Sequence, residues 1–171
     1  MRFRNYNITL LILIFSGTFY SCGVYGFRPK NPPEGIKTLA VPLFGDESNF
    51  SEPTVRENFT EKLKSLIVND NTFYITDQSE ADGLISCTIT AISDEPLVIS
   101  GNENVSKRKI NISVSVDFQN LKTQKKIWNR VFTNWGEYNS TDTGFSEREI
   151  GINEAINKIC EDILNDITSN W

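Results

Sequence analysis

The nine residues from Ile110 to Phe118 alternate strictly between apolar and polar side chains, which constrains the fold more than any other stretch of the chain. Successive side chains of a β-strand point to opposite faces, so this pattern predicts a strand that is packed on one face and exposed on the other. A turn-like segment over 120–125 leads into a second strand pattern over 127–135. The two segments predict an antiparallel hairpin whose apolar face needs a covering layer.

Two amphipathic helices could supply that layer. One is expected to begin after Ser51, a candidate N-cap, and to continue to about Asn69. The other is expected to begin at a capping box formed by Ser146 and Glu149 and to run almost to the C-terminus. The expected core includes residues on these helices and on the alternating strand: Phe59, Val114, Val116, Ile156 and Ile159.

Further strands are predicted over 36–44, 72–76 and 84–92, with a loop over 45–50. The first of them is either a strand covered on both faces or one that ends near Pro42. In the last of these strands, Ile85, Cys87, Ile89 and Ala91 are expected to share one face. The element order is then strand, helix, several strands, helix. We expect an α+β fold in which two helices pack on one face of a mostly antiparallel or mixed β-sheet, with 36–171 as a single domain.

The first 21 residues have the layout of a secretory signal peptide, with Arg2 and Arg4 ahead of a short apolar run over 8–15. A helix that spans a bilayer needs roughly 20 apolar residues, and this run is far shorter. The small residue directly before Cys22 gives the site a resemblance to a bacterial lipobox, although Tyr20 departs from the usual small residue. We therefore expect residues 1–21 to be removed.

Cys22 is the expected attachment point for diacylglyceryl and acyl lipid, and a plain secreted thiol is the alternative. A single acyl chain anchors a protein only marginally, whereas three chains would hold it firmly in a membrane. Residues 22–35 contain three prolines and are expected to form an extended tether. An acidic cluster does not follow the cysteine, which favours the periplasmic side of the membrane.

The mature chain would carry 15 basic and 22 acidic residues, a net charge of −7. Nucleic-acid binding depends on a basic surface, so DNA and RNA are not expected partners.

The chain contains no histidine, which removes the commonest general base and metal ligand. Gly-rich phosphate loops are absent, and the neighbouring acids Glu161 and Asp162 fit the solvent-exposed side of the last helix. Cys87 and Cys160 are expected in the core, either as buried thiols or as a disulfide. We expect no enzymatic activity, no metal and no cofactor apart from the covalent lipid on Cys22.

Three consecutive bases, Lys107, Arg108 and Lys109, lie between a predicted loop over 100–106 and the strand that begins at Ile110. Such a cluster could contact phosphates through charge-assisted hydrogen bonds. The alternative is a solvated strand end that discourages pairing between sheet edges.

The ordered features together resemble the LPS-assembly lipoprotein (LptE) family. The resemblance is carried by the lipobox cysteine, by the motifs KTLAVPLFGDES, VRENFTEKLKSLI, EADGLISCTITAI and VSVDFQNLKTQKKIWNR, and by the closing AINKICEDILNDITSNW. It covers nearly all of the mature chain. One departure is Thr123-Gln124 at the hairpin turn, where a glycine is more usual.

The resemblance implies a non-enzymatic lipoprotein of the outer membrane, facing the periplasm. It would act as a plug and assembly partner of a large β-barrel (LptD-like) and assist delivery of lipopolysaccharide to the outer leaflet. Lys107, Arg108 and Lys109 would then be candidate contacts for lipopolysaccharide phosphates. A regulator or adaptor of a cell-wall enzyme or secretion pore is the alternative, since TLAVPLF followed by a helix also opens other lipoprotein domains.

Overall fold

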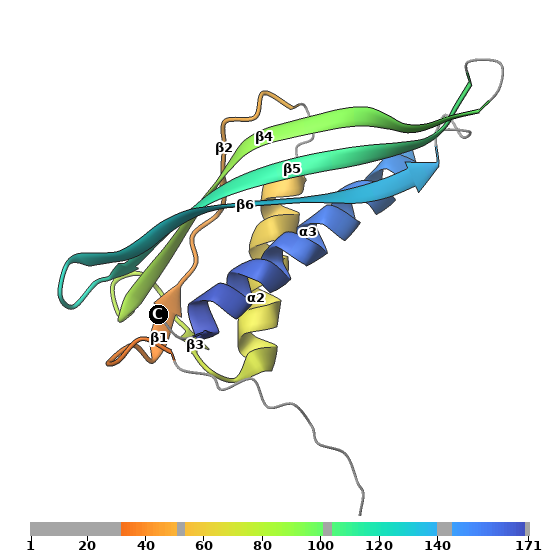
Figure 1. Ribbon diagram of the computed structural model, residues 1–171. Coiled ribbons are helices and arrows are strands. Elements are labelled where there is room, and N and C mark those ends of the chain that lie inside the picture. Colours follow the sequence, from red (N-terminus) through yellow and green to blue (C-terminus); the bar gives the residue numbers. More distant parts are fainter. Residues whose placement is uncertain (1–31, 51–53, 101–103, 140–144, 170–171) are drawn as a thin grey trace, which may run out of the picture.

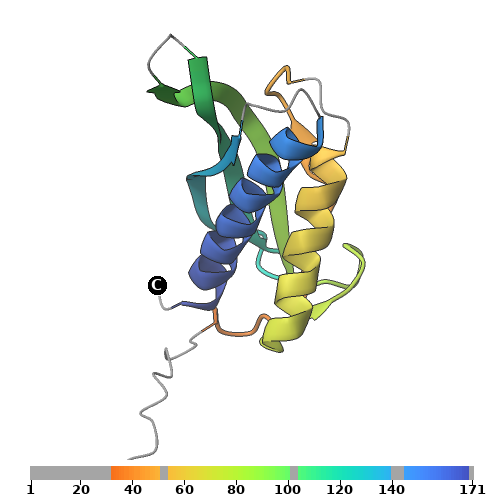
Figure 2. The same ribbon diagram turned by 90° about the vertical axis from the view of Figure 1, so that its right-hand side faces the viewer.

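A computed structural model describes residues 32–50, 54–100, 104–139 and 145–169. These residues form a six-stranded mixed sheet with two long helices on one of its faces (Figures 1 and 2). The α+β architecture and the placement of both helices on one face are therefore confirmed. The elements, in chain order, are β1 Thr38–Ala40, β2 Gly45–Asp46, α2 Val55–Asp70, β3 Tyr74–Ile75, β4 Gly83–Ser100, β5 Asn104–Asn120, β6 Lys125–Asn139 and α3 Phe145–Thr168.

The sheet combines a short parallel part with a long antiparallel part. Its strand order is β3-β1-β4-β5-β6, and β2 pairs with β4 beyond the end of β1. β1 is parallel to both β3 and β4, whereas β4, β5 and β6 form an antiparallel meander. The meander is much longer than the predicted strands, because β4 and β5 continue to Ser100 and Asn104.

The predicted strand over 36–44 is present only as β1, Thr38–Ala40, which agrees with the alternative that the strand ends near Pro42. β1 ends at Ala40, and β2 covers Gly45 and Asp46, inside the predicted loop. Pro42 lies between them and has no backbone N–H to donate to a neighbouring strand, so ladder pairing stops there and resumes beyond it. The prediction for 72–76 is confirmed as the shorter strand β3.

A β-bulge changes the predicted faces of β4. The register shifts between Ile89, which is opposite Val114, and Ala91, which is opposite Ser113. An extra residue at a bulge reverses the alternation of side chains beyond it. Ile85, Cys87 and Ile89 are buried as predicted, but Ala91 is exposed, and Ile92 packs against the core in its place.

Both helices are present, but their starting residues differ from the prediction. α2 begins at Val55, and Thr54 at the N-cap position makes no side-chain capping bond. The predicted cap Ser51 lies outside the described residues. α3 begins at Phe145, so Ser146 is inside the helix and is not its N-cap. The spacing of a capping box also occurs within helices, so the motif alone does not fix a helix start.

The core lies between the helix pair and the covered face of the sheet. The predicted core residues are all buried, and Phe59 of α2 stacks on Phe44 with ring centroids 5.1 Å apart. Phe118 and Trp128 meet edge to face across β5 and β6 at 5.6 Å. The apolar stripe predicted for α3 is buried throughout: Ile152, Ala155, Ile156, Ile159, Cys160, Ile163 and Ile167.

The turn between β5 and β6 forms without the glycine that is more usual at this position. Gln124 adopts a left-handed backbone conformation with φ 56°, which residues other than glycine adopt at a cost. Its own side chain donates a hydrogen bond of 2.8 Å to the carbonyl of Leu121, and Asn120 Oδ1 accepts one of 2.9 Å from the Thr123 amide. Side-chain hydrogen bonds thus hold the turn.

Candidate functional site

The three predicted phosphate contacts lie inside β5 and not at a strand end. β5 begins at Asn104, so the expected position of Lys107, Arg108 and Lys109 at the mouth of a strand beginning at Ile110 is wrong. The loop expected over 100–106 is largely strand, because β4 continues to Ser100 and pairs there with Asn104. The bases therefore belong to the part of the β4–β5 hairpin beside the first turns of α3, and the tip of the hairpin reaches past the helices (Figure 1).

The structure divides the three bases between the two faces of the sheet. Ile110 and Ile112 are buried beneath the helices, and Arg108 shares their face by strand alternation. By the same alternation Lys107 and Lys109 leave β5 on the opposite face, and Lys107, which is opposite the last residue of β6, also lines a pocket of about 210 Å³ with Glu147 and Ile150 of α3. One ligand group on one face of the sheet therefore meets two of these bases and not all three.

Each of the three bases forms an ion pair with a carboxylate from a neighbouring strand. Lys107 Nζ lies 3.3 Å from Glu137 Oε2, and Lys109 Nζ lies 3.5 Å from Glu95 Oε2. Arg108 Nε lies 2.7 Å from Asp94 Oδ1. The positive cluster that the sequence shows is thus locally neutralised by the register of β4 and β6.

Asp94 of β4 connects its own strand to β5, β6 and α3 at this end of the sheet. Its carboxylate accepts hydrogen bonds of 2.7 Å from Arg108 Nε and from the Tyr138 hydroxyl, and Arg148 Nε of α3 lies at 3.6 Å. The hydrogen bond with Asp94 raises the pKa of Arg108, and burial together with the same carboxylate raises the pKa of Tyr138. Arg148 also covers the ring of Phe50 at 4.5 Å. No local sequence pattern predicts this network, because its members come from distant segments.

Asp82 forms a comparable joint at the opposite end of the sheet. Its carboxylate accepts amide hydrogen bonds of 2.8 Å from Lys37 and 3.1 Å from Thr38, and Lys122 Nζ lies 2.6 Å away. The hydrogen bond with Lys122, followed by those with the amides, holds the pKa of Asp82 well below its usual range. Asp82 thus connects the start of β1 to the β5–β6 turn, which gives it a structural role.

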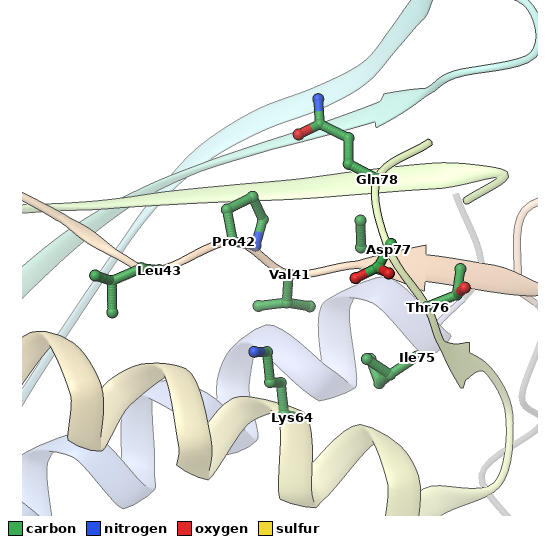
Figure 3. A pocket seen from close by; sticks show the side chains of 9 residues that line it. Val41, Pro42, Leu43, Lys64, Ile75, Thr76, Asp77 and Gln78 are labelled. Atoms are coloured by element: carbon green, nitrogen blue, oxygen red, sulfur yellow. The ribbon is translucent and has the colours of Figure 1, made fainter. Parts of the chain in front are cut away.

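A pocket of about 500 Å³ opens beside the parallel part of the sheet. We call it the β1–α2 pocket. Three segments that are far apart in the sequence line it: the chain after β1, one side of α2, and the chain from β3 onward (Figure 3). Its lining residues are Ala40, Val41, Pro42, Leu43, Lys64, Ile75, Thr76, Asp77 and Gln78.

Lys64 and Asp77 are the charged groups of the β1–α2 pocket. In Figure 3 the Lys64 side chain extends from α2 toward Val41, and the Asp77 carboxylate enters from the segment after β3. Within the described ranges no ion pair joins either group to another residue. The pocket thus offers a cation and an anion for binding, and a lysine and an aspartate alone do not make an acid–base or nucleophilic centre there.

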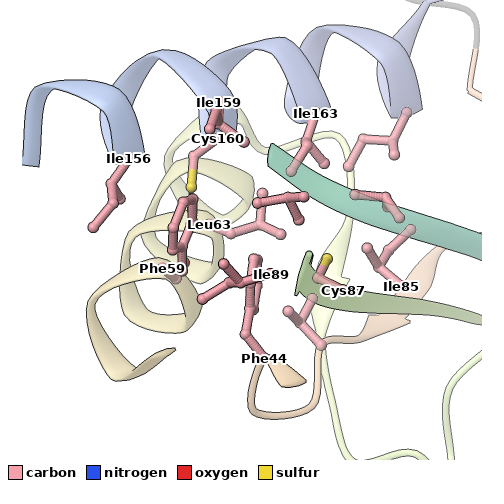
Figure 4. Close-up of a cluster of buried hydrophobic side chains, with 14 of the residues drawn as sticks. Phe44, Phe59, Leu63, Ile85, Cys87, Ile89, Ile156, Ile159, Cys160 and Ile163 are labelled. Atoms are coloured by element: carbon pink, nitrogen blue, oxygen red, sulfur yellow. Dashed lines mark hydrogen bonds between the residues drawn. The ribbon is translucent and has the colours of Figure 1, made fainter. Parts of the chain in front are cut away.

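Cys87 and Cys160 are free thiols in the core, so the disulfide alternative is not what the structure shows. They come from β4 and α3 and lie among aliphatic and aromatic side chains (Figure 4). Burial raises the pKa of Cys87 well above its usual value and that of Cys160 to about 12. Thiols with such pKa values are unreactive. The lipidation site Cys22 lies outside the described residues.

The part of the chain that the structure describes presents no metal-binding cluster and no helix that could span a membrane. It contains no group of three or more Cys, Asp or Glu side chains arranged to hold a metal ion. None of its helices combines the length and the apolar character that crossing a bilayer requires.

Comparison with known families gives one match that spans most of the chain. The model of the LptE family, described as lipopolysaccharide-assembly, matches residues 36–169. No curated protein matches the sequence significantly.

Solved structures with the same fold come from several bacteria. Rare lipoprotein B from Shewanella oneidensis is 11% identical with a TM-score of 0.52, over 77% of this chain and 93% of that one. A minor lipoprotein from Acinetobacter baumannii is 12% identical with a TM-score of 0.51, over 78% and 91%. A hypothetical protein from Chlamydia trachomatis is 10% identical with a TM-score of 0.56, over 78% and 96%. At these identities the likeness concerns the fold alone.

Proposed function

Because the chain belongs to the LptE family of lipopolysaccharide-assembly proteins, we propose that it is a lipid-anchored, non-enzymatic component of the machinery that delivers lipopolysaccharide to the outer leaflet of the outer membrane. In this role it faces the periplasm and acts as plug and assembly partner of a large β-barrel of the LptD type. The family match over residues 36–169 is the observation that carries the proposal.

Two features of the chain support a binding role over a catalytic one. The sequence has no histidine, and the two thiols in the described part of the structure are buried and hard to ionise. The charged side chains at the two ends of the sheet are engaged in ion pairs that join strands, as at Asp82 and Asp94. Such pairs hold a binding surface in a fixed shape.

The barrel partner is tested by purification. A tagged full-length protein extracted from outer membranes in mild detergent should bring down a barrel of LptD type in a one-to-one ratio. If it instead brings down a cell-wall enzyme or a secretion pore, and no such barrel, the role of regulator or adaptor replaces the one proposed here.

We further propose that Cys22 is the lipidated N-terminus of the mature protein. The thioether-linked lipid and the acylated amine would replace residues 1–21 as the membrane attachment. The variant Cys22→Ala should appear in the soluble periplasmic fraction or remain as an uncleaved precursor, and intact mass should show the loss of the acyl chains. Wild-type mass and membrane retention in this variant would contradict the assignment.

Among the candidate bases Lys107, Arg108 and Lys109, the two lysines are the proposed contacts for lipopolysaccharide phosphates, and Arg108 on the other face is tested separately. An arginine clamps two phosphate oxygens, and a lysine acts as a compact point charge. A mature protein with a net charge of −7 repels an anionic lipid overall, so positive charges on the hairpin matter locally. A bound phosphate would replace Glu137 at Lys107 and Glu95 at Lys109.

A matched pair of variants tests the phosphate contacts. Lys107→Gln with Lys109→Gln should weaken binding of purified lipopolysaccharide and reduce its dependence on salt, since salt screens exposed charges. Lys125→Gln with Lys126→Gln removes the same charge at the opposite end of β6 and should leave binding unchanged. Equal affinity of both double variants and the wild type across a salt titration would assign the bases to sheet stability only. Arg108→Gln, measured separately, reports the contribution of the other face.

A further inference from the structure

The edge strand β3 ends beside the β1–α2 pocket, and β1 continues past its end as the edge of the sheet. The amides of Tyr74 and Thr76 donate hydrogen bonds of 2.9 Å and 3.0 Å to the carbonyls of Lys37 and Leu39. Every second residue of β1 therefore directs its backbone groups toward β3, and Val41 is the next residue in that series. β3 ends at Ile75, before it can pair with Val41.

The segment after β3 turns away and leaves Val41, which lines the pocket and is 5% exposed, without a partner strand on this side. The Glu80 amide donates a hydrogen bond of 3.0 Å to the Asp77 carbonyl, which closes a turn directly after Thr76. Among the described residues, none hydrogen-bonds to the backbone N–H or C=O of Val41. Backbone groups beside a cavity that lack partners at the edge of a sheet are a template for an additional strand.

Pro42 does not obstruct such a strand. The Asp82 amide donates to the Thr38 carbonyl at 3.1 Å, so the other residues of the alternation face β4. The missing N–H of Pro42 belongs to that side by the same alternation. The proline therefore interrupts the pairing with β4 and leaves the backbone groups of Val41 available on the pocket side.

The charges beside this edge select for an acidic partner. Lys64 is half-buried and extends toward Val41, whereas Asp77 is exposed and well solvated. A cation that is partly shielded from water attracts an anion more strongly than an exposed carboxylate attracts a cation. The lining residue Leu43 and the neighbouring Tyr74, which are 49% and 75% exposed, add apolar surface.

We propose that the β1–α2 pocket binds an extended, acidic peptide segment of a partner protein, which adds to the sheet as a short strand beside Val41 and places a carboxylate on Lys64. This is recognition by strand addition, in which main-chain hydrogen bonds give affinity and side-chain contacts give specificity. The inference rests only on the unpaired backbone of Val41 and on the β1–α2 pocket. Its test does not depend on lipopolysaccharide binding or on the barrel partner.

The test uses the full-length protein and a phage-displayed library of random 12-residue peptides. Selection should enrich sequences that contain Asp or Glu, and synthetic copies of them should bind the wild-type protein. Lys64→Gln should weaken their binding roughly fivefold, the scale expected for one partly exposed charge pair. Lys125→Gln removes a charge outside the pocket and should leave their binding unchanged.

Amide hydrogen exchange separates strand addition from simple charge attraction. A bound peptide that pairs with the edge should slow exchange at the Val41 amide, because that N–H would become a donor to the peptide. The proposal is overturned by a selection that enriches nothing over the naive library, by peptides that bind Lys64→Gln and wild type equally, or by binding that leaves exchange at Val41 unchanged.

Discussion

Gly136 and Gly151 mark the place where α3 comes closest to β6, and the two glycines should respond very differently to the same substitution. A Cβ on Gly136 would overlap the carbonyl oxygen of Gly151 and lie 2.9 Å from its carbonyl carbon and 2.8 Å from Glu154 Cβ. A Cβ on Gly151 would meet Tyr138 Cδ1 at 3.2 Å and strand carbonyls at 3.4 Å. Only the first substitution demands that backbone move.

The loss of stability expected for Gly136→Ala follows from how far α3 must move away from β6. Ordinary contacts begin at 3.4 Å, so α3 must retreat by at least 0.5 Å at the Gly151 carbonyl carbon and by more at the oxygen. The helix also holds a continuous buried stripe, so a shift disturbs the core along its length. Overpacking of this kind costs about 1–3 kcal/mol, and a backbone clash belongs at the upper end of that range. For a domain of this size we expect the thermal midpoint to fall by roughly 4–10 °C.

The control is Gly151→Ala, which removes a flexible residue from a helix. Replacing a helical glycine by alanine stabilises by about 0.5–1 kcal/mol, which offsets the slightly tight contact with Tyr138. Urea unfolding followed by far-UV circular dichroism gives both free energies of unfolding. A Gly136→Ala variant as stable as wild type, or a Gly151→Ala variant that is the more damaged of the two, would refute the close approach described here.

Three further predictions concern the core, the joint at Asp82 and the thiols. Ile156→Ala should lower the free energy of unfolding by about 2–5 kcal/mol, whereas Ile150→Ala on the exposed side of α3 should change it by less than about 0.5 kcal/mol in the same urea titration. The lowered pKa of Asp82 means that its stabilisation is present above its ordinary pKa of 3.8 and is lost as the pH falls below it. Asp82→Asn should therefore unfold at a lower urea concentration than wild type at pH 7, and the gap should narrow at pH 3; a gap independent of pH would contradict this assignment. Iodoacetamide at pH 8 should modify Cys87 and Cys160 only after denaturation, and rapid labelling of the folded protein, followed by mass spectrometry, would show that they are not buried.

The elements that repeat a simple period were predictable from the sequence. The alternation from Ile110 to Phe118 placed β5 and its buried face correctly, because strand geometry repeats every two residues. The stripe through Ile156 and Ile163 located α3 and its covered side for the corresponding helical reason.

The features that depend on a partner strand were not predictable. Nothing local in the sequence marks the bulge beside Ile89, because a bulge is defined by what lies across the ladder. The β1–α2 pocket escaped prediction because its three lining segments meet only in the fold. The close approach of Gly136 and Gly151 is likewise a contact between two elements. In the sequence, each glycine alone indicates only a residue that destabilises its own strand or helix.

The basic segment of β5 shows how register changes the meaning of a sequence motif. In the sequence Lys107, Arg108 and Lys109 form one cluster, but in the sheet each meets a carboxylate. Exposed pairs contribute only about 0–1 kcal/mol, so the pair at Lys107, whose side chain is 50% exposed, yields readily to a phosphate. Arg108 differs because its carboxylate partner also binds Tyr138 and approaches α3, and releasing it would loosen four elements at once. Phosphate binding is therefore expected at the two lysines, while Arg108 keeps the hairpin that carries them in place.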